Sequence, residues 1–300
     1  CDIQPYLIPG LDAYTVVFVN GRYNAAQSTL PAEQGIHASH EATLANQRAT
    51  YNHFFQAYAD AACTDVVNVL VEKNAHISKP IHFIHVVTNA QVLAQPRINL
   101  IAMQGAEVKC VESFVGTENA KSFTNRTLDI EVQENATVIW DKMQLENDAQ
   151  FLMNEENVRI AGNGRFTINT LTIDGGWVRN ALNISLDGQN IEANLNGFYM
   201  PRRKQFVDNH TKVDHRLPHC NSNELYKGVM TDKSTGVFNG KIMVHQAAQK
   251  TNAFQSNQNI LLTDRATINT KPELEIYADD VKCSHGCTIG QLDEEAMFYL

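Results

Sequence analysis

The stretch that decides the fold is NATVIWDKMQLENDAQFLMNEENVRIAGNGRFTI, residues 135–168. It contains three short turn motifs of one kind, each with a turn-forming residue, a small residue and a polar residue before an apolar position. The motifs are NATV at Asn135, DAQF at Asp148 and NGRF at Asn163. Asn, Asp and Gly tolerate the backbone angles of tight turns, and Ala suits a crowded corner.

The same motif recurs along the chain, with its small residue returning at steps of 13 to 16 residues. Earlier copies stand at Asn74, Asn89, Gly105 and Asn119. Between the turns apolar residues alternate, as Phe166 and Ile168 do in RFTINTLTI, which is typical of strands. A unit of this size cannot bury its own apolar face, but stacked units can. The pattern therefore predicts a mainly β protein, a β-solenoid with two units in each coil.

Two other β-containing architectures fit the pattern less well. A β-sandwich would show turns about every 8–12 residues without this register. A parallel α/β sheet would need a crossover helix in each step. The spacing of the turns argues against the β-sandwich, and the lack of helical patterns between the turns argues against the parallel α/β sheet.

One segment near the N-terminus breaks the strand pattern. From Gly35 to about Ala62 the chain is rich in Ala, Gln and Glu, with Tyr51, Phe54 and Tyr58 at helical spacing. It predicts a helical segment that covers one end of the solenoid, where strand edges are otherwise open.

The chain is expected to divide into four parts. They are an N-terminal connecting segment (1–35), a helical cap (36–65), a β-helix core (66–290) and the start of a C-terminal helical region (291–300). Asp293 and the two acidic residues after it favour a helix start, and no stop signal follows. We expect further chain on both sides.

Composition narrows the function classes. The 300 residues carry a net charge of −9, which argues against a general nucleic-acid binder. The apolar runs are too short to span a bilayer, and no export signal is visible. Six cysteines spread over this length indicate reduced thiols in a cytoplasmic protein.

The strongest local candidate for chemistry is DDVKCSHGCTIG, residues 279–290. Cys283, His285 and Cys287 alternate there, so a strand would present all three on one face. Thiolate and imidazole groups suit zinc, iron or an iron–sulfur species. Apolar residues flank the three on the same face, and buried free cysteine is a common small apolar side chain. A metal site and a structural strand face both remain open.

A second group of possible ligands lies in VDNHTKVDHRLPHCN, residues 207–221. Its members are Asp208, His210, Asp214, His215, His219 and Cys220. The residue types suit zinc or iron, but the spacing matches no short ligand signature. Solenoid corners also use such side chains to satisfy backbone groups, and this structural role is the prediction.

Three further motifs are expected to carry no catalysis. TGVFNGKI (Thr235–Ile242) is similar to a phosphate-binding loop, but its glycines are too close and Ile242 replaces the magnesium-binding Ser or Thr. The acidic pair 155–156 would point to opposite faces of a strand, which predicts solvated charges rather than paired catalytic acids. The histidines of HFIH (82–85) are predicted to be structural.

Four longer stretches resemble the SufD group of the SufB/SufD family, which belongs to the Suf iron–sulfur cluster assembly system. They are VDNHTKVDHRLPHC, YKGVMTDKSTGVFNGKI, QKTNAFQSNQNILLTDRATINTKPELEI and KPELEIYADDVKCSHGCTIGQLDEEAMFYL. The resemblance extends over residues 11–300 and implies a right-handed parallel β-helix flanked by helical segments. It also implies a non-enzymatic scaffold that supports iron entry and nascent cluster formation.

The partners come from the same resemblance. It implies a heterodimer with SufB, a homodimer where SufB is missing, and docking of the ATPase SufC through a C-terminal helical region mostly beyond Leu300. No cofactor is expected to bind firmly, although iron or a nascent cluster can lie at the partner interface. No nucleic-acid or membrane partner is expected.

Individual residues separate the two branches of the family. Asn257 stands where SufB carries its scaffold cysteine, and Gly286 stands where SufB has a Glu after its His. The resemblance assigns His285, and with it Cys283, to the SufB interface as candidate iron ligands. Cys287 departs from the family pattern and receives no role from it.

An alternative from the fold class alone is a carbohydrate-binding or carbohydrate-cleaving β-helix. That function needs export and an exposed row of acids or aromatic residues, and the chain has only two Trp.

Overall fold

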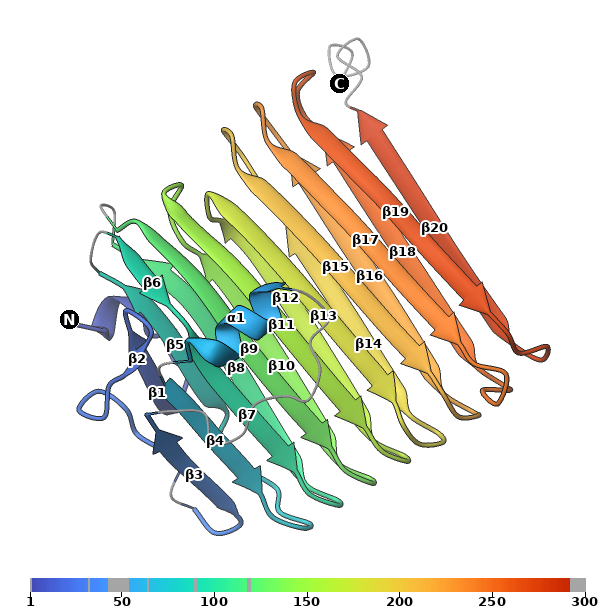
Figure 1. Cartoon of the computed structure of the whole chain (residues 1–300), viewed down its shortest axis with the longest axis horizontal. Helices are drawn as coiled ribbons and strands as arrows, with labels where there is room; N and C mark the ends of the chain where they lie inside the picture. Colours follow the sequence, from blue (N-terminus) through green and yellow to red (C-terminus); the bar gives the residue numbers. More distant parts are fainter. Residues whose placement is uncertain are drawn as a thin grey trace.

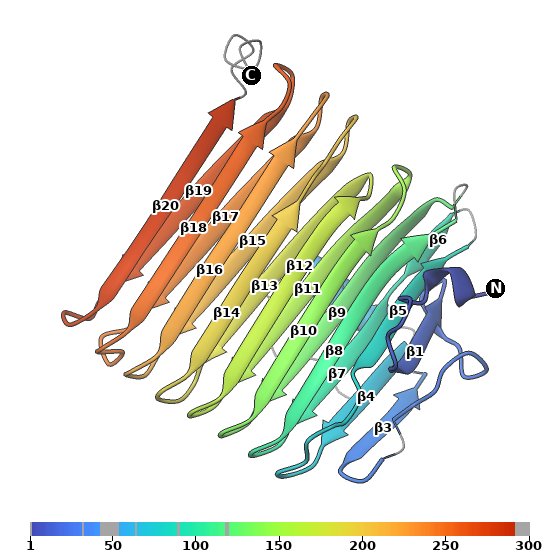
Figure 2. The same cartoon turned by 180° about the vertical axis from the view of Figure 1, so that it is seen from behind.

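The computed structural model describes residues 2–31, 33–42, 54–63, 65–88, 91–117 and 120–291. Within them the chain winds into two long sheets, which Figure 1 and Figure 2 show from opposite sides. The predicted β-solenoid is confirmed, with about eight turns. Besides the strands there is a 3₁₀ helix (Gln4–Tyr6) and one α-helix, α1 (Phe54–Ala61).

The first sheet runs in the order β2-β1-β5-β8-β10-β12-β14-β16-β18-β20. Its strands are β1 (Tyr14–Val19), β2 (Arg22–Tyr23), β5 (Ile81–Val87), β8 (Glu107–Gly116), β10 (Thr137–Leu145), β12 (Arg165–Asp174), β14 (Glu192–Tyr199), β16 (Asn221–Met230), β18 (Asn252–Leu261) and β20 (Lys282–Gln291).

The second sheet runs in the order β19-β17-β15-β13-β11-β9-β7-β4-β3, and β6 also pairs with β9. Its strands are β3 (Ile36–Glu41), β4 (Asp65–Val71), β6 (Val92–Ala94), β7 (Pro96–Ala102), β9 (Ser122–Val132), β11 (Gln150–Ile160), β13 (Trp177–Leu186), β15 (Phe206–His215), β17 (Thr235–Val244) and β19 (Thr267–Ile276).

The chain crosses from one sheet to the other at every turn, so two strands make one coil. Val138 of β10 lies in register with Phe166 of β12, and Ile184 of β13 with Val213 of β15. Such partners are about thirty residues apart in sequence, which is two predicted units. The register therefore confirms that each coil contains two copies of the turn motif.

The corners show why the motif has its composition. Asn135 adopts φ of 59°, a left-handed conformation that Asn tolerates better than most residues. The next residue, Ala136, is fully buried, so a larger side chain would collide with the stacked corner. The predicted turns at Asn89 and Asn119 lie outside the described residues.

The core fills the space between the two sheets. In β12, Phe166 and Ile168 point inward and are buried, as their alternation predicts. The Trp140 ring stacks on Phe83 from another coil with 5.3 Å between the ring centroids. Burial of each such side chain stabilises the fold by roughly 1.5–3 kcal/mol.

The N-terminal part differs from the sequence prediction. Residues 1–35, expected to be a connecting segment, include β1, which pairs in parallel with β5. Residues 36–65, expected to be a helical cap, begin with β3, which pairs antiparallel with β4. Only Phe54–Ala61 is helical in the described part, and residues 43–53 lie outside it. Short strands therefore form this end of the solenoid.

The α-helix lies across the outer face of the second sheet rather than over an end (Figure 1). The Phe55 ring meets Phe123 of β9 edge-on, at 5.9 Å between centroids. Arg97 of β7 donates to Asp60 of the helix at 2.5 Å, and both side chains are buried. The apolar helical face found in the sequence is thus used against a sheet face. The C-terminal helical region was expected over residues 291–300, but Gln291 is the last residue of β20, and the residues from 292 on lie outside the described part.

The sequence also predicted that no segment spans a membrane and that the cysteines are reduced. None of the helices in the described ranges has the length and apolarity needed to cross a bilayer. The five cysteines in these ranges are free, at 63, 110, 220, 283 and 287.

Candidate functional site: the open C-terminal end of the solenoid

The two sheets end in β19 and β20, which we call the open end. Each strand has ten residues and, in the described part of the chain, pairs on one side only, β19 with β17 and β20 with β18. At the opposite end the outermost strands β2 and β3 have only two and six residues. Long edge strands present rows of unpaired backbone N–H and C=O groups. The open end is therefore the larger template for another chain.

Register fixes which way the side chains of β20 point. Cys283 pairs with Ala253 of β18 and His285 pairs with Gln255. Both β18 residues are buried inside the solenoid, and paired residues of parallel strands share a face. Cys283 and His285 therefore face inward. His285 is nonetheless exposed, because no further coil stacks on it in the described part.

The predicted alternation of the CSHGC motif is confirmed. Cys287 pairs with the buried Asn257, so it shares the inward face with Cys283 and His285. Its Sγ lies 3.1 Å from the Oγ1 of Thr270 on β19. This contact joins the last strands of the two sheets.

The burial of Cys283 affects the protonation of its thiol. Cys283 is partly buried and packs beside a small apolar cluster that includes Ile242 and Ala253. Burial raises the pKa of the Cys283 thiol, although a backbone hydrogen bond from Ala253 acts in the opposite direction. Cys283 therefore stays protonated at neutral pH unless a metal ion displaces its proton.

The three side chains do not form a closed metal site by themselves. Alternate residues on a strand are about 6.6 Å apart, too far for one ion to bind all three. Across the ranges that the structure describes, no three His, Cys, Asp or Glu side chains come together as a possible metal site. A metal ion at the open end would need ligands from another molecule.

The second candidate cluster is dispersed, in agreement with its predicted structural role. His215 faces inward, where its Nε2 lies 2.9 Å from Ser222 Oγ, and burial lowers its pKa to about 4. His210 lies 2.9 Å from Asp208 and is partly exposed. His219 occupies a corner with φ of 62°. Cys220 is buried beside that corner, 3.3 Å from the Gly188 carbonyl.

The HFIH histidines, predicted to be structural, are buried in β5. His82 Nε2 lies 2.8 Å from Ser113 Oγ, and burial lowers the pKa of His82 to about 4. His85 Nε2 lies 2.9 Å from a carboxylate oxygen of Glu112. Burial lowers the pKa of His85 too, although Glu112 raises it in part. Both rings are neutral structural groups.

The prediction for the acidic pair 155–156 was half wrong. The two side chains do point to opposite faces, but both are buried rather than solvated, each with 1% of its surface exposed. Glu155 lies under the α-helix and accepts a hydrogen bond from Gln56 at 3.2 Å. Glu156 points into the solenoid, where two cations neutralise it: Arg126 at 2.8 Å and Lys142 at 2.7 Å.

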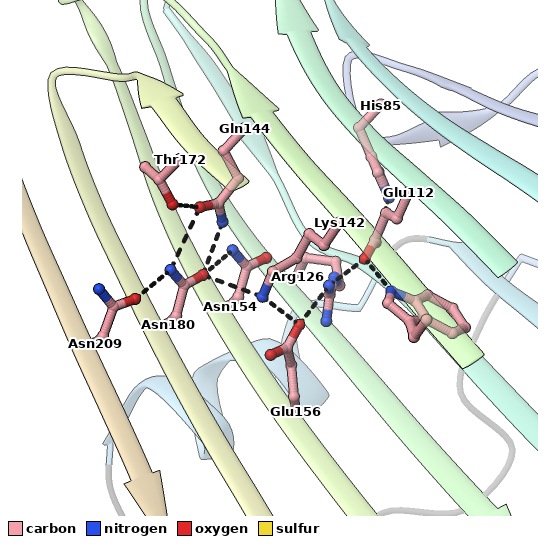
Figure 3. A network of polar contacts seen from close by, with 11 residues as sticks. His85, Glu112, Arg126, Lys142, Gln144, Asn154, Glu156, Thr172, Asn180 and Asn209 are labelled. Atoms are coloured by element: carbon pink, nitrogen blue, oxygen red, sulfur yellow. Dashed lines mark hydrogen bonds and ion pairs between the residues drawn. The ribbon is translucent and has the colours of Figure 1, made fainter. Parts of the chain in front are cut away.

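Glu156 belongs to a charged network inside the solenoid that the sequence reasoning missed (Figure 3). Arg126, which is fully buried, bridges Glu156 and Glu112. Trp140 donates its indole N–H to Glu112 at 3.0 Å. Burial alone would raise the pKa of Glu112, but the positive charge of Arg126, the hydrogen bond from His85 and the charge of Lys142 act together in the opposite direction and lower that pKa to about 2.

The network continues toward the open end through amide side chains. Asn180 accepts from Lys142 at 3.2 Å and donates to Asn209 at 2.9 Å (Figure 3). Arg126, Asn154, Asn180 and Asn209 occupy one register column of the second sheet. Polar residues thus recur in the sequence at steps of one coil, and this recurrence is the signal that could have predicted the network.

A further polar group lies directly beneath the open end. Glu224 of β16 is buried and accepts a hydrogen bond from Gln255 Nε2 at 2.7 Å. Burial raises the pKa of Glu224 to about 7, although hydrogen bonds from Thr211 and Gln255 lower it in part. Asn257, next to Gln255 on the inward face, donates to the Tyr199 hydroxyl at 3.3 Å. The floor of the open end is therefore polar.

Comparison with known proteins gives a consistent result. Residues 85–300 match the family model described as SUF system FeS cluster assembly, SufBD core domain. The chain is 32% identical over 299 residues to the iron-sulfur cluster assembly protein SufD of Escherichia coli K12, covering 97% of this chain and 70% of that protein.

Two further relatives are similar over most of the chain. An iron-sulfur cluster assembly SufBD family protein of Synechocystis is 29% identical, with 99% of this chain and 70% of the relative covered. Protein ABCI7, chloroplastic, of Arabidopsis thaliana is 34% identical, with 69% and 44% covered.

Proposed function

Because the chain belongs to the SufBD family of Suf-system iron–sulfur cluster assembly proteins, we propose that it is a non-enzymatic scaffold subunit that pairs with SufB. A role in iron–sulfur cluster assembly follows from the family. The scaffold role and the named partner go further and are the proposal.

The observation that carries the proposal is the open end. Two ten-residue edge strands lie side by side there, with exposed inward-facing side chains that a further coil would cover. A SufB molecule that continued the sheets would satisfy the free backbone groups and bury this face. Such pairing suits a partner that is itself a β-helix.

The interface would contain an incomplete ligand set. His285 is exposed at the open end, with Cys283 two residues away on the same face. We assign these two side chains to the handling of iron or a nascent cluster, with the remaining ligands supplied by SufB. The iron is cargo in this scheme, and no firmly bound cofactor is required.

The rest of the proposal rests on the family resemblance. The ATPase SufC would dock on the C-terminal helical region expected after β20. ATP hydrolysis then belongs to SufC, which agrees with the failed phosphate-loop match at Thr235–Ile242. The assembly is proposed to act in the cytoplasm.

The test is co-expression of the chain, with its natural flanking segments, with SufB and SufC of the same system. We expect the three to co-purify and His285→Ala to lower cluster delivery to an acceptor enzyme at least several-fold. The solenoid should stay folded, because His285 is exposed on the last described strand.

His37→Ala is the matched control, since His37 is also exposed but lies on β3, at the other end. It should deliver clusters normally. Failure of the wild-type chain to bind SufB, or normal delivery by His285→Ala, would refute the proposal.

A further inference from the structure

We propose that Gln255 is a positioning residue for His285. Its side-chain carbonyl accepts a hydrogen bond from one ring N–H, which leaves the other ring nitrogen free as a ligand at the open end. This inference rests on the proposed function, since that function gives His285 its role.

The positions of three residues in neighbouring coils carry the argument. Glu224 of β16, Gln255 of β18 and His285 of β20 occupy one register column of the first sheet. Glu224 and Gln255 each have 3% of their surface exposed. Gln255 is thus a buried amide between a buried carboxyl group and the exposed imidazole.

The contacts of Gln255 leave one of its polar atoms without a partner. Its Nε2 donates to Glu224 Oε2 at 2.7 Å, so the nitrogen of the amide is directed toward β16. Its Oε1 is buried and has no hydrogen-bond partner among the residues that the structure describes. A buried amide oxygen without a hydrogen-bond donor destabilises the folded state, so a donor is expected nearby.

The residue of the opposite sheet that faces the amide has no side chain that could donate. Gly240 of β17 faces the amide, and a Cβ at that position would lie 2.3 Å from Gln255 Nε2. The Gln255 side chain therefore has its room because Gly240 has no side chain. This close approach holds the amide in place.

His285 is the donor that the column supplies. Adjacent strands are about 4.8 Å apart, so paired side chains on one face are neighbours. The ring is exposed and can rotate over Gln255 at little cost. A ring N–H that donates to a carbonyl fixes the tautomer, and such second-layer contacts orient histidine ligands in metal sites.

The test is the neutral tautomer ratio of His285 in the whole chain, measured from the ring nitrogen chemical shifts at about pH 8.5, which is about two units above the reference pKa of a histidine side chain. One tautomer should prevail in the wild type. Gln255→Met, which keeps the volume but removes the acceptor, should change the ratio about three- to ten-fold, the worth of one neutral hydrogen bond.

Gln258→Met is the matched control, because Gln258 lies on the same strand but on its exposed outer face. Its ratio should equal that of the wild type. Should Gln255→Met not fold, Gln255→Asn withdraws the carbonyl by one methylene and should give the same change.

Two outcomes would overturn the inference: a wild-type ratio like that of a solvent-exposed histidine, or equal ratios in all three proteins. Neither depends on SufB. An unchanged ratio together with a delivery defect in His285→Ala would refute the positioning role alone, whereas loss of SufB binding by the wild type would refute the proposed function alone.

Discussion

At the scale of single residues, buried charge sets this protein apart from an ordinary apolar solenoid. Arg126 and Lys142 lie among Glu112 and Glu156, and all four are almost inaccessible to solvent. Two cations balance two carboxylates there. Burial of a balanced set contributes little net stability, but removal of one member leaves an uncompensated charge.

Arg126→Met should therefore lower the free energy of unfolding by about 3–5 kcal/mol, because it leaves Glu112 and Glu156 with too little positive charge. Urea unfolding monitored by tryptophan fluorescence measures this change. Arg165→Met is the control. Arg165 is 67% exposed and lies 4.0 Å from Glu192, so its loss should change the free energy by less than about 0.5 kcal/mol. A loss below about 1 kcal/mol in Arg126→Met would contradict the argument.

Glu146 gives a prediction about pH. It is buried, its Oε2 has no hydrogen-bond partner among the described residues, and burial raises its pKa to about 8. The unfolded chain releases this proton at its ordinary pKa of about 4.5, so stability falls as pH rises from there to about 8. Glu146→Gln should match the wild type near pH 4.5 and be more stable above pH 8, by roughly 2–4 kcal/mol.

Chemical denaturation at several pH values tests this expectation. Glu192→Gln changes an exposed carboxyl group instead and should leave the pH profile unchanged. A Glu146→Gln profile parallel to that of the wild type would show that Glu146 is not protonated in the folded state.

At the scale of elements, β18 and β20 show the same alternation of inward and outward side chains, but the inward side chains differ in burial. On β18 most inward positions are buried beneath a further strand, whereas on β20 Cys283 is only partly buried and the inward positions from His285 to Ile289 are exposed. The inward face of β20 includes Ile289, which is 49% exposed. An apolar residue in that position is expected if a partner covers it.

Ile289→Lys should therefore weaken binding to SufB at least tenfold while leaving the stability of the isolated chain nearly unchanged. The dissociation constant, measured by calorimetry, gives the result. Ile260→Lys is a close control, because Ile260 is 44% exposed but lies on the outward face of β18. Equal affinities of the two variants would show that SufB does not cover the inward face.

At the scale of the whole molecule, the two ends of the solenoid are unlike. Short strands, β2 and β3, form the N-terminal end, while β19 and β20 keep their full length at the other (Figure 1). The buried polar groups lie between these ends, in columns that follow the register. Because each coil contacts only its neighbours, the stack can be extended by another molecule at the open end without rearrangement.

The coil length and the side-chain directions could be predicted from the sequence, because both depend on local periodicity. The turn motif predicted the coil length, since a turn-forming residue followed by a small residue recurs at regular steps along the sequence. The alternation in CSHGC likewise determined that Cys283, His285 and Cys287 share a face, because successive strand residues point in opposite directions.

Contacts between coils could not be predicted in this way. The helical pattern around Phe55 showed an apolar face but not which surface would cover it, and the structure places it on β9. Glu156 looked like a solvated charge because its partner Arg126 is thirty residues away. The coil and the direction of each side chain follow from the amino-acid sequence, because they depend on neighbours in the chain. Which charges are buried, and which end of the described solenoid carries long edge strands, is set by tertiary contacts, because both depend on what stacks above and below.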